Sequence, residues 1–202
     1  MSRMRWLEVE VEGLRIRVPE SVYPPELDTA LMLRCLRSAH PAGKRVLDVG
    51  TGSGALAVAA ALWGASEVVA TDVNPLCELA VQVNSQRYGV QVEFRLGDLF
   101  QPVRGERFEL ITFNPPYLAE EPRDLASAAW AGGPRGRRLI DRFVEGVGEH
   151  LTPGGAALLL QAESNGLDET LNLARRLGLL VTPVGSQKVA FDRLWVLRIS
   201  LP

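Results

Sequence analysis

Short apolar runs alternate with helix-like segments from residue 45 to the end of the chain, and this alternation constrains the fold more than any other feature. Continuous apolar runs of strand length, separated by helices, are typical of a parallel sheet that is covered on both faces. Strands are predicted at 45–50, 67–72, 92–98, 108–113, 156–162, 179–189 and 194–200, and helices at 54–63, 75–88, about 137–150 and 167–177.

The two ends of the chain complete this prediction. The last two strands have no room for a helix between them, so they are expected to pair antiparallel. Before residue 45, strands 6–12 and 14–18 form a plausible hairpin around Gly13, and Asp28 and Thr29 open a helix. The sequence therefore predicts an α/β fold: a doubly wound, seven-stranded, mostly parallel sheet with an antiparallel C-terminal strand and a short N-terminal hairpin and helix.

Composition and patterning place the chain among ordinary globular proteins, at 47% hydrophobic and 23% charged residues. Without a linker or repeat, one domain is expected over residues 1–202, with residues 1–40 as an extension packed on it. Since no apolar run reaches about 18 residues and the N-terminus is too charged for a signal peptide, the cytoplasm is the expected location. Cys35 and Cys77 have no metal-ligand spacing, and no metal site is predicted.

A glycine-rich loop, DVGTGSG at 48–54, joins the first parallel strand to the first helix of the sheet. Its glycines, Gly50, Gly52 and Gly54, allow a tight turn and a close approach of a ligand to the backbone. Asp72 ends the next strand, where a carboxylate can accept hydrogen bonds from ribose hydroxyls. These features alone leave two ligands open, a nicotinamide dinucleotide and another nucleoside ligand.

Two further acids favour S-adenosylmethionine over a dinucleotide. Asp48 precedes the glycines, where a carboxylate would attract the sulfonium and amino cations of this cofactor and repel a pyrophosphate. Asp98 ends the third strand at the same sheet edge, where it can accept the adenine amine while Leu99 packs on the base. The sequence therefore predicts an S-adenosylmethionine site formed by the loop 48–54, Thr51 included, with Asp72, Asp98 and Leu99.

The tetrapeptide Asn114-Pro115-Pro116-Tyr117 follows the fourth strand and is the predicted catalytic element. Its prolines end the strand and leave carbonyl oxygens without a partner. The Asn114 side-chain oxygen and the Pro115 carbonyl can then accept both hydrogens of one NH2 group, beside the flat face of Tyr117. An amide or aniline-like nitrogen is a poor nucleophile because its lone pair is conjugated, and two acceptors direct that lone pair toward a methyl donor. Methyl transfer to a planar NH2 nitrogen is therefore expected.

A long connection between Tyr117 and about Arg137 is rich in Pro, Gly, Ala and Arg, and loops of this length are usually functional. Trp130 within it is predicted to anchor the loop on the core rather than to stack on a substrate. The arginines around it either hold an acidic surface or phosphates, or form a solvated face: Arg123, Arg135, Arg137, Arg138 and Arg142. The net charge of −2 counts against extensive binding to phosphates.

Several motifs together resemble the HemK-type methyltransferases, which modify the glutamine of the Gly-Gly-Gln motif in translation release factors. The shared motifs are DVGTGSGAL, ATDVNP, GDLF and FNPPY. VYPPELDTALML (22–33) and AWAGGPRGRRLIDRF (129–143) are most similar to the short branch without an N-terminal helical domain, which is typical of eukaryotes and archaea. The resemblance covers about residues 20–200 and implies a class I, Rossmann-like methyltransferase fold.

The resemblance also implies roles for particular residues. It makes Asn114 to Tyr117 the substrate-amide site and places Tyr23 near its mouth. In eukaryotes, short-branch members act with a small zinc-binding activator subunit, and related Asn-Pro-Pro-Tyr enzymes methylate adenine or guanine amines. The implied cofactor contacts are Thr29, Asp48, Gly50, Asp72, Asp98 and Leu99.

Four hypotheses follow from the sequence, of which a nicotinamide enzyme is the least favoured. The leading one is a methyltransferase acting on the side-chain amide of a release-factor glutamine. The second is a methyltransferase for an exocyclic base amine in rRNA or DNA, which would be expected to carry a basic surface and an extra recognition domain. The third is a non-catalytic, cofactor-binding partner subunit, against which the intact tetrapeptide at Asn114 argues.

Overall fold

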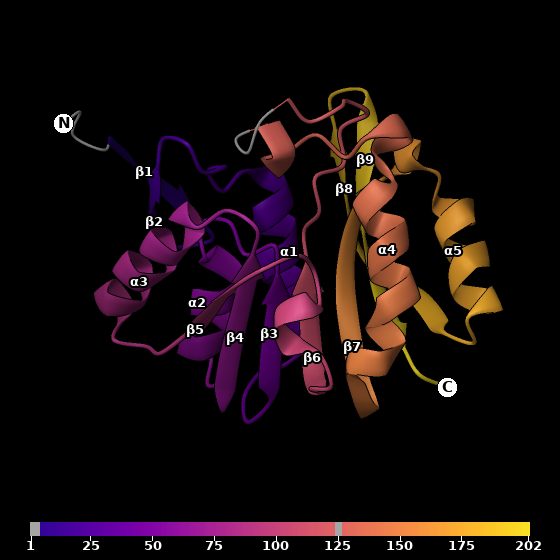
Figure 1. The fold of residues 1–202 in the computed structure, drawn as a ribbon, viewed down its shortest axis with the longest axis horizontal. Helices are drawn as coiled ribbons and strands as arrows, with labels where there is room; N and C mark the ends of the chain where they lie inside the picture. Colours follow the sequence, from indigo (N-terminus) through magenta and orange to yellow (C-terminus); the bar gives the residue numbers. More distant parts are fainter. Residues whose placement is uncertain (1–4, 124–126) are drawn as a thin grey trace.

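The computed structural model describes residues 5–123 and 127–202, and its centre is a seven-stranded sheet (Figure 1). The strands are ordered β5-β4-β3-β6-β7-β9-β8. Their bounds are β3 Arg45–Val49, β4 Glu67–Asp72, β5 Glu93–Leu96, β6 Phe108–Phe113, β7 Leu151–Ala162, β8 Leu180–Val189 and β9 Asp192–Ser200. The predicted doubly wound α/β sheet is confirmed.

Strand β9 runs antiparallel to both of its neighbours, β7 and β8. The antiparallel strand therefore lies between these two strands, while β8 forms the edge of the sheet. Strand β7 begins at Leu151, earlier than the predicted residue 156. The pairing of β6 with β7 shifts register between Phe108 and Leu110, and this irregularity accommodates the Pro-Gly-Gly run that suggested a turn in the sequence.

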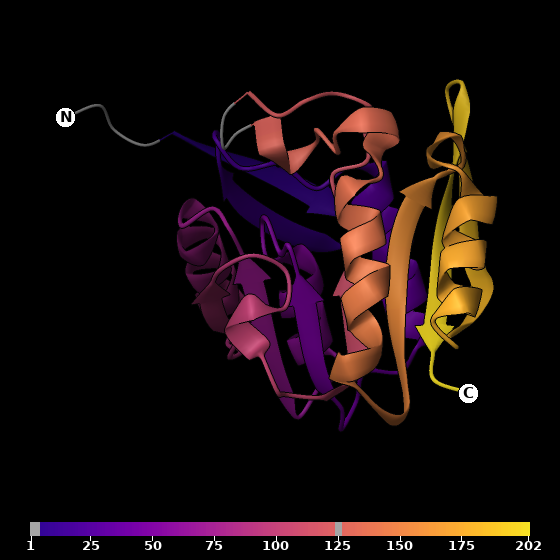
Figure 2. The ribbon, with the colours of Figure 1, turned by 45° about the vertical axis from the view of Figure 1, so that its right-hand side comes forward.

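In the described residues, five α-helices cover the two faces of the sheet, as Figure 2 shows from a second direction. Their bounds are α1 Leu27–Ser38, α2 Ala55–Leu62, α3 Leu76–Tyr88, α4 Arg138–Val147 and α5 Leu167–Arg176. Helices α1 and α2 share one hydrophobic cluster with sheet residues such as Val46 and Leu110. Helix α4 shares the opposite cluster with Leu47 and Ile111, so adjacent strand residues face opposite layers.

The N-terminal hairpin of β1 (Trp6–Val11) and β2 (Leu14–Pro19) is a separate antiparallel sheet. The fully buried side chain of Asn84 on α3 joins it to the body of the molecule. Its Oδ1 accepts the Arg17 amide hydrogen at 2.9 Å, while its Nδ2 donates to the Arg17 carbonyl at 2.7 Å and to the Ser53 carbonyl at 3.0 Å. One side chain thus fixes both the hairpin and the glycine loop.

The parallel strands β3, β4, β5 and β6 end at the same edge of the sheet. This brings Gly50, Asp72, Asp98 and Asn114, which the sequence separates widely, to neighbouring strand ends. Within residues 5–123 and 127–202, no helix has the length and hydrophobicity needed to cross a membrane.

Candidate active site

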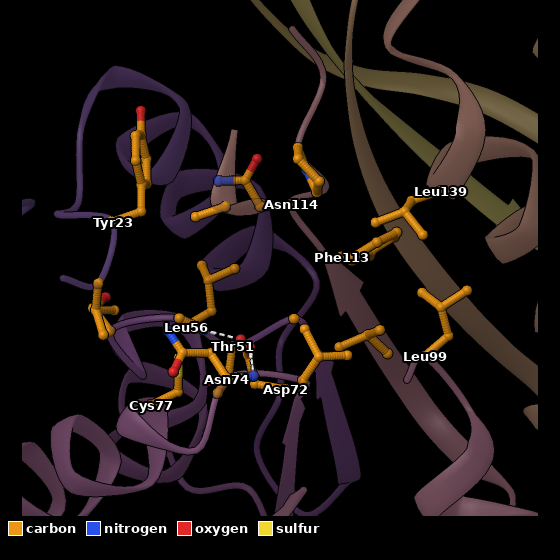
Figure 3. A pocket seen from close by; sticks show the side chains of 18 of the residues that line it. Tyr23, Thr51, Leu56, Asp72, Asn74, Cys77, Leu99, Phe113, Asn114 and Leu139 are labelled. Atoms are coloured by element: carbon orange, nitrogen blue, oxygen red, sulfur yellow. Dashed lines mark hydrogen bonds between the residues drawn. The ribbon is translucent and has the colours of Figure 1, made fainter. Parts of the chain in front are cut away.

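A cavity opens at this sheet edge and gathers most of the predicted cofactor residues (Figure 3). Figure 3 shows Asn114 and Tyr23 toward one end of it, and Thr51, Asp72 and Asn74 toward the other. The predicted residues that line it are Thr29, Gly50, Thr51, Gly52, Asp72, Asp98, Leu99, Asn114 and Pro116.

Asp72 is held at the cavity wall by two backbone amides. Its Oδ2 accepts from the Gly52 N–H at 2.9 Å, and its Oδ1 accepts from the Asn74 N–H at 2.9 Å. The glycine loop passes close to Phe113, since a Cβ on Gly50 would lie 3.1 Å from the Phe113 ring, so the loop has little room to move at this point. The Asp72 carboxylate therefore has a fixed orientation, with lone pairs left for hydroxyl donors in the cavity.

Asp48 lies behind the cavity wall and has only 1% of its surface exposed. Its two oxygens accept hydrogen bonds from the Thr112 hydroxyl at 2.6 Å and from the Thr51 hydroxyl at 2.7 Å. Burial raises the pKa of Asp48 to about 6, assisted by the charge of Asp72 and opposed by the two threonine hydroxyls. In the described part of the chain, Thr51 rather than Asp48 forms the cavity surface, so the carboxylate of Asp48 can reach a ligand only through its charge or through Thr51.

Gly54 has a packing role at the start of α2. A Cβ at this position would lie 3.0 Å from the Val81 Cγ2 and 3.2 Å from the Val81 Cα. Among the described residues that line the cavity, Gly54 is absent. Its place in the loop is therefore explained by the close approach of α2 to α3, although the sequence grouped it with the cofactor contacts.

Asp98 and Leu99 lie on the cavity wall next to α4. The Asp98 Oδ2 is 2.7 Å from the Arg142 Nη2, an ion pair in which both side chains are partly exposed. Leu99, Phe113 and Leu139 provide the apolar surface beside this pair (Figure 3). The wall thus combines a carboxylate with apolar side chains, as a flat heterocycle with an amino group requires.

A second hollow adjoins the first and is lined by the whole predicted catalytic tetrapeptide. Both cavities share Tyr23, Asn114, Pro116 and Ala129, so Asn114 lies where they meet. Trp130 lines the second hollow and is 37% exposed, which differs from the predicted anchor packed on the core. This arrangement can hold a cofactor in the first hollow, the cofactor chamber, next to an acceptor group in the second hollow, the acceptor chamber.

The Asn114 side chain presents an unpaired acceptor at this junction. Its Nδ2 donates to the Asp28 Oδ2 at 3.1 Å, while its Oδ1 is buried and meets no donor among the described residues. The adjacent Pro115 carbonyl likewise receives no hydrogen bond from residues 5–123 or 127–202. Leaving a buried acceptor unpaired costs about 1–3 kcal/mol, so a bound donor would stabilise this site.

The carbonyls of Pro116 and Tyr117 are in close contact with the loop and with the short turn before α5. The Asn165 Nδ2 donates to the Tyr117 carbonyl at 2.8 Å. A Cβ on Gly132 would collide with the Pro116 carbonyl, and one on Gly136, at φ +67°, with the Tyr117 carbonyl. These contacts leave the Pro115 carbonyl as the backbone acceptor beside Asn114.

Tyr117 is uncharged at neutral pH, and four of the arginines around the loop are paired with acidic side chains. Burial, with the charges of Asp28 and Glu26, raises the pKa of Tyr117, so its hydroxyl keeps its proton at neutral pH. Four of the five arginines for which the sequence left two roles open pair with acids: Arg135 with Glu169, Arg137 with Asp141, Arg138 with Glu121 and Arg142 with Asp98.

Two residues of this arrangement were not predicted to belong to the site. Asp28 contacts Asn114, but its position before an apolar helix suggested only a helix start. Asn165 supports Tyr117 from a short turn before α5, where the sequence carries no recognisable motif. The sequence does carry one signal for Asp28, because it precedes Thr29 in the segment 22–33 that carries the family resemblance.

Comparison with known proteins agrees with the geometry of the site. Residues 24–182 match the family model described as "Methyltransferase small domain". The chain is 34% identical to the "Putative protein N5-glutamine methyltransferase MJ0928" of Methanocaldococcus jannaschii, over 94% of this chain and 96% of that protein. It is 33% identical to the human "Methyltransferase HEMK2", over 89% of each protein.

A solved structure leads to the same assignment. Mtq2 of E. cuniculi, determined in complex with Trm112 and described as responsible for methylating the termination factor eRF1, superposes with a TM-score of 0.73. It shares 25% identity and covers 90% of this chain and 99% of that chain. The fold and site thus define a methyltransferase, and the chain belongs to the methyltransferase small domain family. The predicted resemblance to HemK-type enzymes is confirmed.

Proposed function

We propose that this protein transfers a methyl group from S-adenosylmethionine to the side-chain amide nitrogen of a glutamine in the Gly-Gly-Gln loop of a translation release factor. The observation that carries the proposal is the buried, unpaired Asn114 Oδ1 at the junction of the two cavities. Together with the Pro115 carbonyl it offers two acceptors, which match the two hydrogens of a primary amide. The names of MJ0928 and of the Mtq2 complex support this acceptor.

The first cavity suits S-adenosylmethionine, which when bound supplies a methyl group activated by a sulfonium. Asp72 is oriented by Gly52 and Asn74 so that its carboxylate can accept from a ribose diol. Asp98 can accept from the adenine amine, between the apolar walls formed by Leu99 and Leu139. The buried charge of Asp48 lies behind Thr51 and favours a cationic ligand over a pyrophosphate.

The second cavity orients the acceptor nitrogen. With one hydrogen bonded to the Asn114 Oδ1 and the other to the Pro115 carbonyl, the amide plane is fixed and its lone pair can face the first cavity. Both acceptors also stabilise the positive charge that develops on nitrogen during attack, because they are preorganised and partly removed from water. Holding the two reactants in this geometry can lower the barrier by roughly 7–11 kcal/mol.

The chain needs no strong base for this reaction. The methylated amide nitrogen carries an extra proton that is lost readily to water once the lone pair is used. Tyr117, which lies beside the site, retains its own proton because burial and the nearby acids raise its pKa. The proposed role of Tyr117 is therefore to provide a flat surface for the acceptor amide.

The paired arginines favour a protein acceptor over nucleic acid. Four arginines of the loop and α4 already contact acidic side chains, and the net charge is −2. A base amine also carries two planar hydrogens, so the site geometry alone fits it as well. Binding of RNA or DNA would fall steeply with added salt through counterion release, whereas binding of a glutamine loop would change little.

A label-transfer experiment tests the proposal. The chain is incubated with labelled S-adenosylmethionine and with a release factor, rRNA or DNA, alone and together with a small partner of the Trm112 kind. We expect label in the release factor and none when its Gly-Gly-Gln glutamine is replaced by alanine. Label in RNA or DNA beside an unlabelled release factor would instead establish the base-amine activity.

A further inference from the structure

The orientation of the Asn114 amide decides what the acceptor chamber can bind. An asparagine side chain has nearly the same shape when its oxygen and nitrogen are exchanged, so shape does not select one orientation. Only one of them directs an oxygen at the incoming NH2 group. In the other, an NH2 would face an NH2, and the attacking nitrogen would lose its second acceptor.

Asp28 selects the orientation. Its side chain is 3% exposed, and its Oδ2 lies 3.1 Å from the Asn114 Nδ2. Its Oδ1 is occupied by the Thr29 N–H at 2.6 Å and the Thr29 hydroxyl at 3.3 Å. Because a carboxylate only accepts hydrogen bonds, Asn114 must turn its NH2 toward Asp28. Its oxygen then points away from Asp28, on a side chain that lines both cavities.

We infer that Asp28 is a positioning residue that makes the acceptor chamber selective for an NH2 group by fixing the Asn114 amide. This inference rests on the proposed function. Asp28 lines the second hollow but acts on the reaction through Asn114, since it is the Asn114 oxygen that is left unpaired. The helix start at Leu27 and Asp28 therefore has a chemical as well as a structural reason.

The isosteric substitution Asp28→Asn should reverse this polarity. Thr29 contributes two donors to one side of residue 28, so the introduced amide keeps its oxygen there. Its nitrogen then takes the place of Oδ2 and donates toward Asn114. Asn114 should then turn its oxygen to residue 28 and its NH2 to the acceptor chamber. The substitution thus removes the side-chain acceptor without removing any atom of Asn114.

The test compares three variants by turnover and by calorimetric affinity for S-adenosylhomocysteine. Asp28→Asn should lower kcat about 100- to 1000-fold, as expected for losing one preorganised contact, with cofactor affinity within about threefold of the unmodified chain. Combining it with Asn114→Ala should lower kcat no further than Asn114→Ala alone. The double variant Asp28→Asn with Asn114→Asp exchanges the two side chains. Its kcat should be at least about tenfold higher than that of Asp28→Asn, because residue 28 then donates to a carboxylate whose other oxygen faces the acceptor.

Asp168→Asn is a matched control, since Asp168 is also the second residue of a helix, α5, and lies outside both cavities. It should leave kcat and cofactor affinity unchanged. Full turnover by Asp28→Asn, additive losses with Asn114→Ala, or an exchange variant no better than Asp28→Asn would overturn the inference. Failure of the proposed function itself looks different, because the unmodified chain would then methylate no glutamine.

Discussion

The two chambers of the active site are built in different ways. The cofactor chamber is formed by strand ends and a contiguous glycine loop, and its acids are already paired: Asp72 with two backbone amides and Asp98 with Arg142. The acceptor chamber holds an unpaired oxygen on Asn114, oriented by Asp28 from a distant helix. The comparison indicates that the residues of the cofactor chamber are marked by local sequence patterns, whereas the acceptor chamber depends on a side-chain contact between distant segments.

Substitution of Asn114 should give the largest difference between the effect on turnover and the effect on cofactor affinity. Asn114→Ala should lower kcat about 100- to 1000-fold, because one preorganised partner of the developing charge is lost. Affinity for S-adenosylhomocysteine, measured by calorimetry, should stay within about threefold. An equal loss of affinity and turnover would show that the two chambers do not function separately.

Asp72→Ala should have the reverse effect. Loss of a charged acceptor, worth about 1.5–3 kcal/mol, predicts a cofactor affinity that is roughly 10- to 100-fold weaker. Turnover at saturating cofactor should change little, because Asp72 lies away from the acceptor chamber. Asp72→Asn, which keeps one acceptor for the Gly52 amide, should fall between the two, and a larger effect on kcat than on affinity would contradict this division of roles.

A glycine pair tests the support of the acceptor chamber. Gly136→Ala places a Cβ against the Tyr117 carbonyl, whereas Gly89→Ala, at a similar φ of +63°, meets open space. The left-handed backbone should cost both about 1–2 kcal/mol of stability, or roughly 2–8 °C in Tm, and Gly136→Ala should lose more because of its clash with the Tyr117 carbonyl. Only Gly136→Ala should also lower kcat, by roughly tenfold if the displacement reaches Pro115. Equal kinetics for the two variants would indicate that the loop does not position the tetrapeptide.

The smallest expected effect concerns Asp48. Its pKa of about 6 means that lowering the pH from 7 to 5 neutralises its charge, so affinity for the cationic cofactor should fall by about threefold. Calorimetry of Asp48→Asn should show no such step.

Because the folded pKa lies above the unfolded value of about 3.9, ionising Asp48 lowers stability as pH rises from about 4 to 6. The Tm advantage of Asp48→Asn should therefore grow over that range and level off above it.

Local patterns were sufficient to predict the fold and the cofactor chamber's outline. Apolar runs and their breaks located every strand of the large sheet, and the ends of parallel strands at one edge brought Asp72, Asp98 and Asn114 together. The exception was the start of β7, where Pro153 and Gly154 suggested a turn and a register shift instead accommodates them.

Contacts between distant segments could not be predicted in the same way. Asp28 lies 86 positions from Asn114, and Asn165 lies 48 from Tyr117, so neither spacing carries a pattern. Asp48 was expected beside the cofactor because it precedes the glycines, but alternation along β3 turns it toward Thr112 on the neighbouring strand β6. Sequence periodicity fixes which residues end a strand, while the partner of each side chain depends on tertiary packing.

The central claim is that the unpaired Asn114 oxygen and the Pro115 carbonyl select a glutamine amide. Tandem mass spectrometry of a release factor, after reaction with the chain and S-adenosylmethionine, tests it most directly by locating the added methyl group. We expect one methyl group on the side-chain nitrogen of the Gly-Gly-Gln glutamine, and a strongly reduced yield with Asn114→Ala. A methyl group on any other atom of the release factor, or an equal yield from Asn114→Ala, would contradict it.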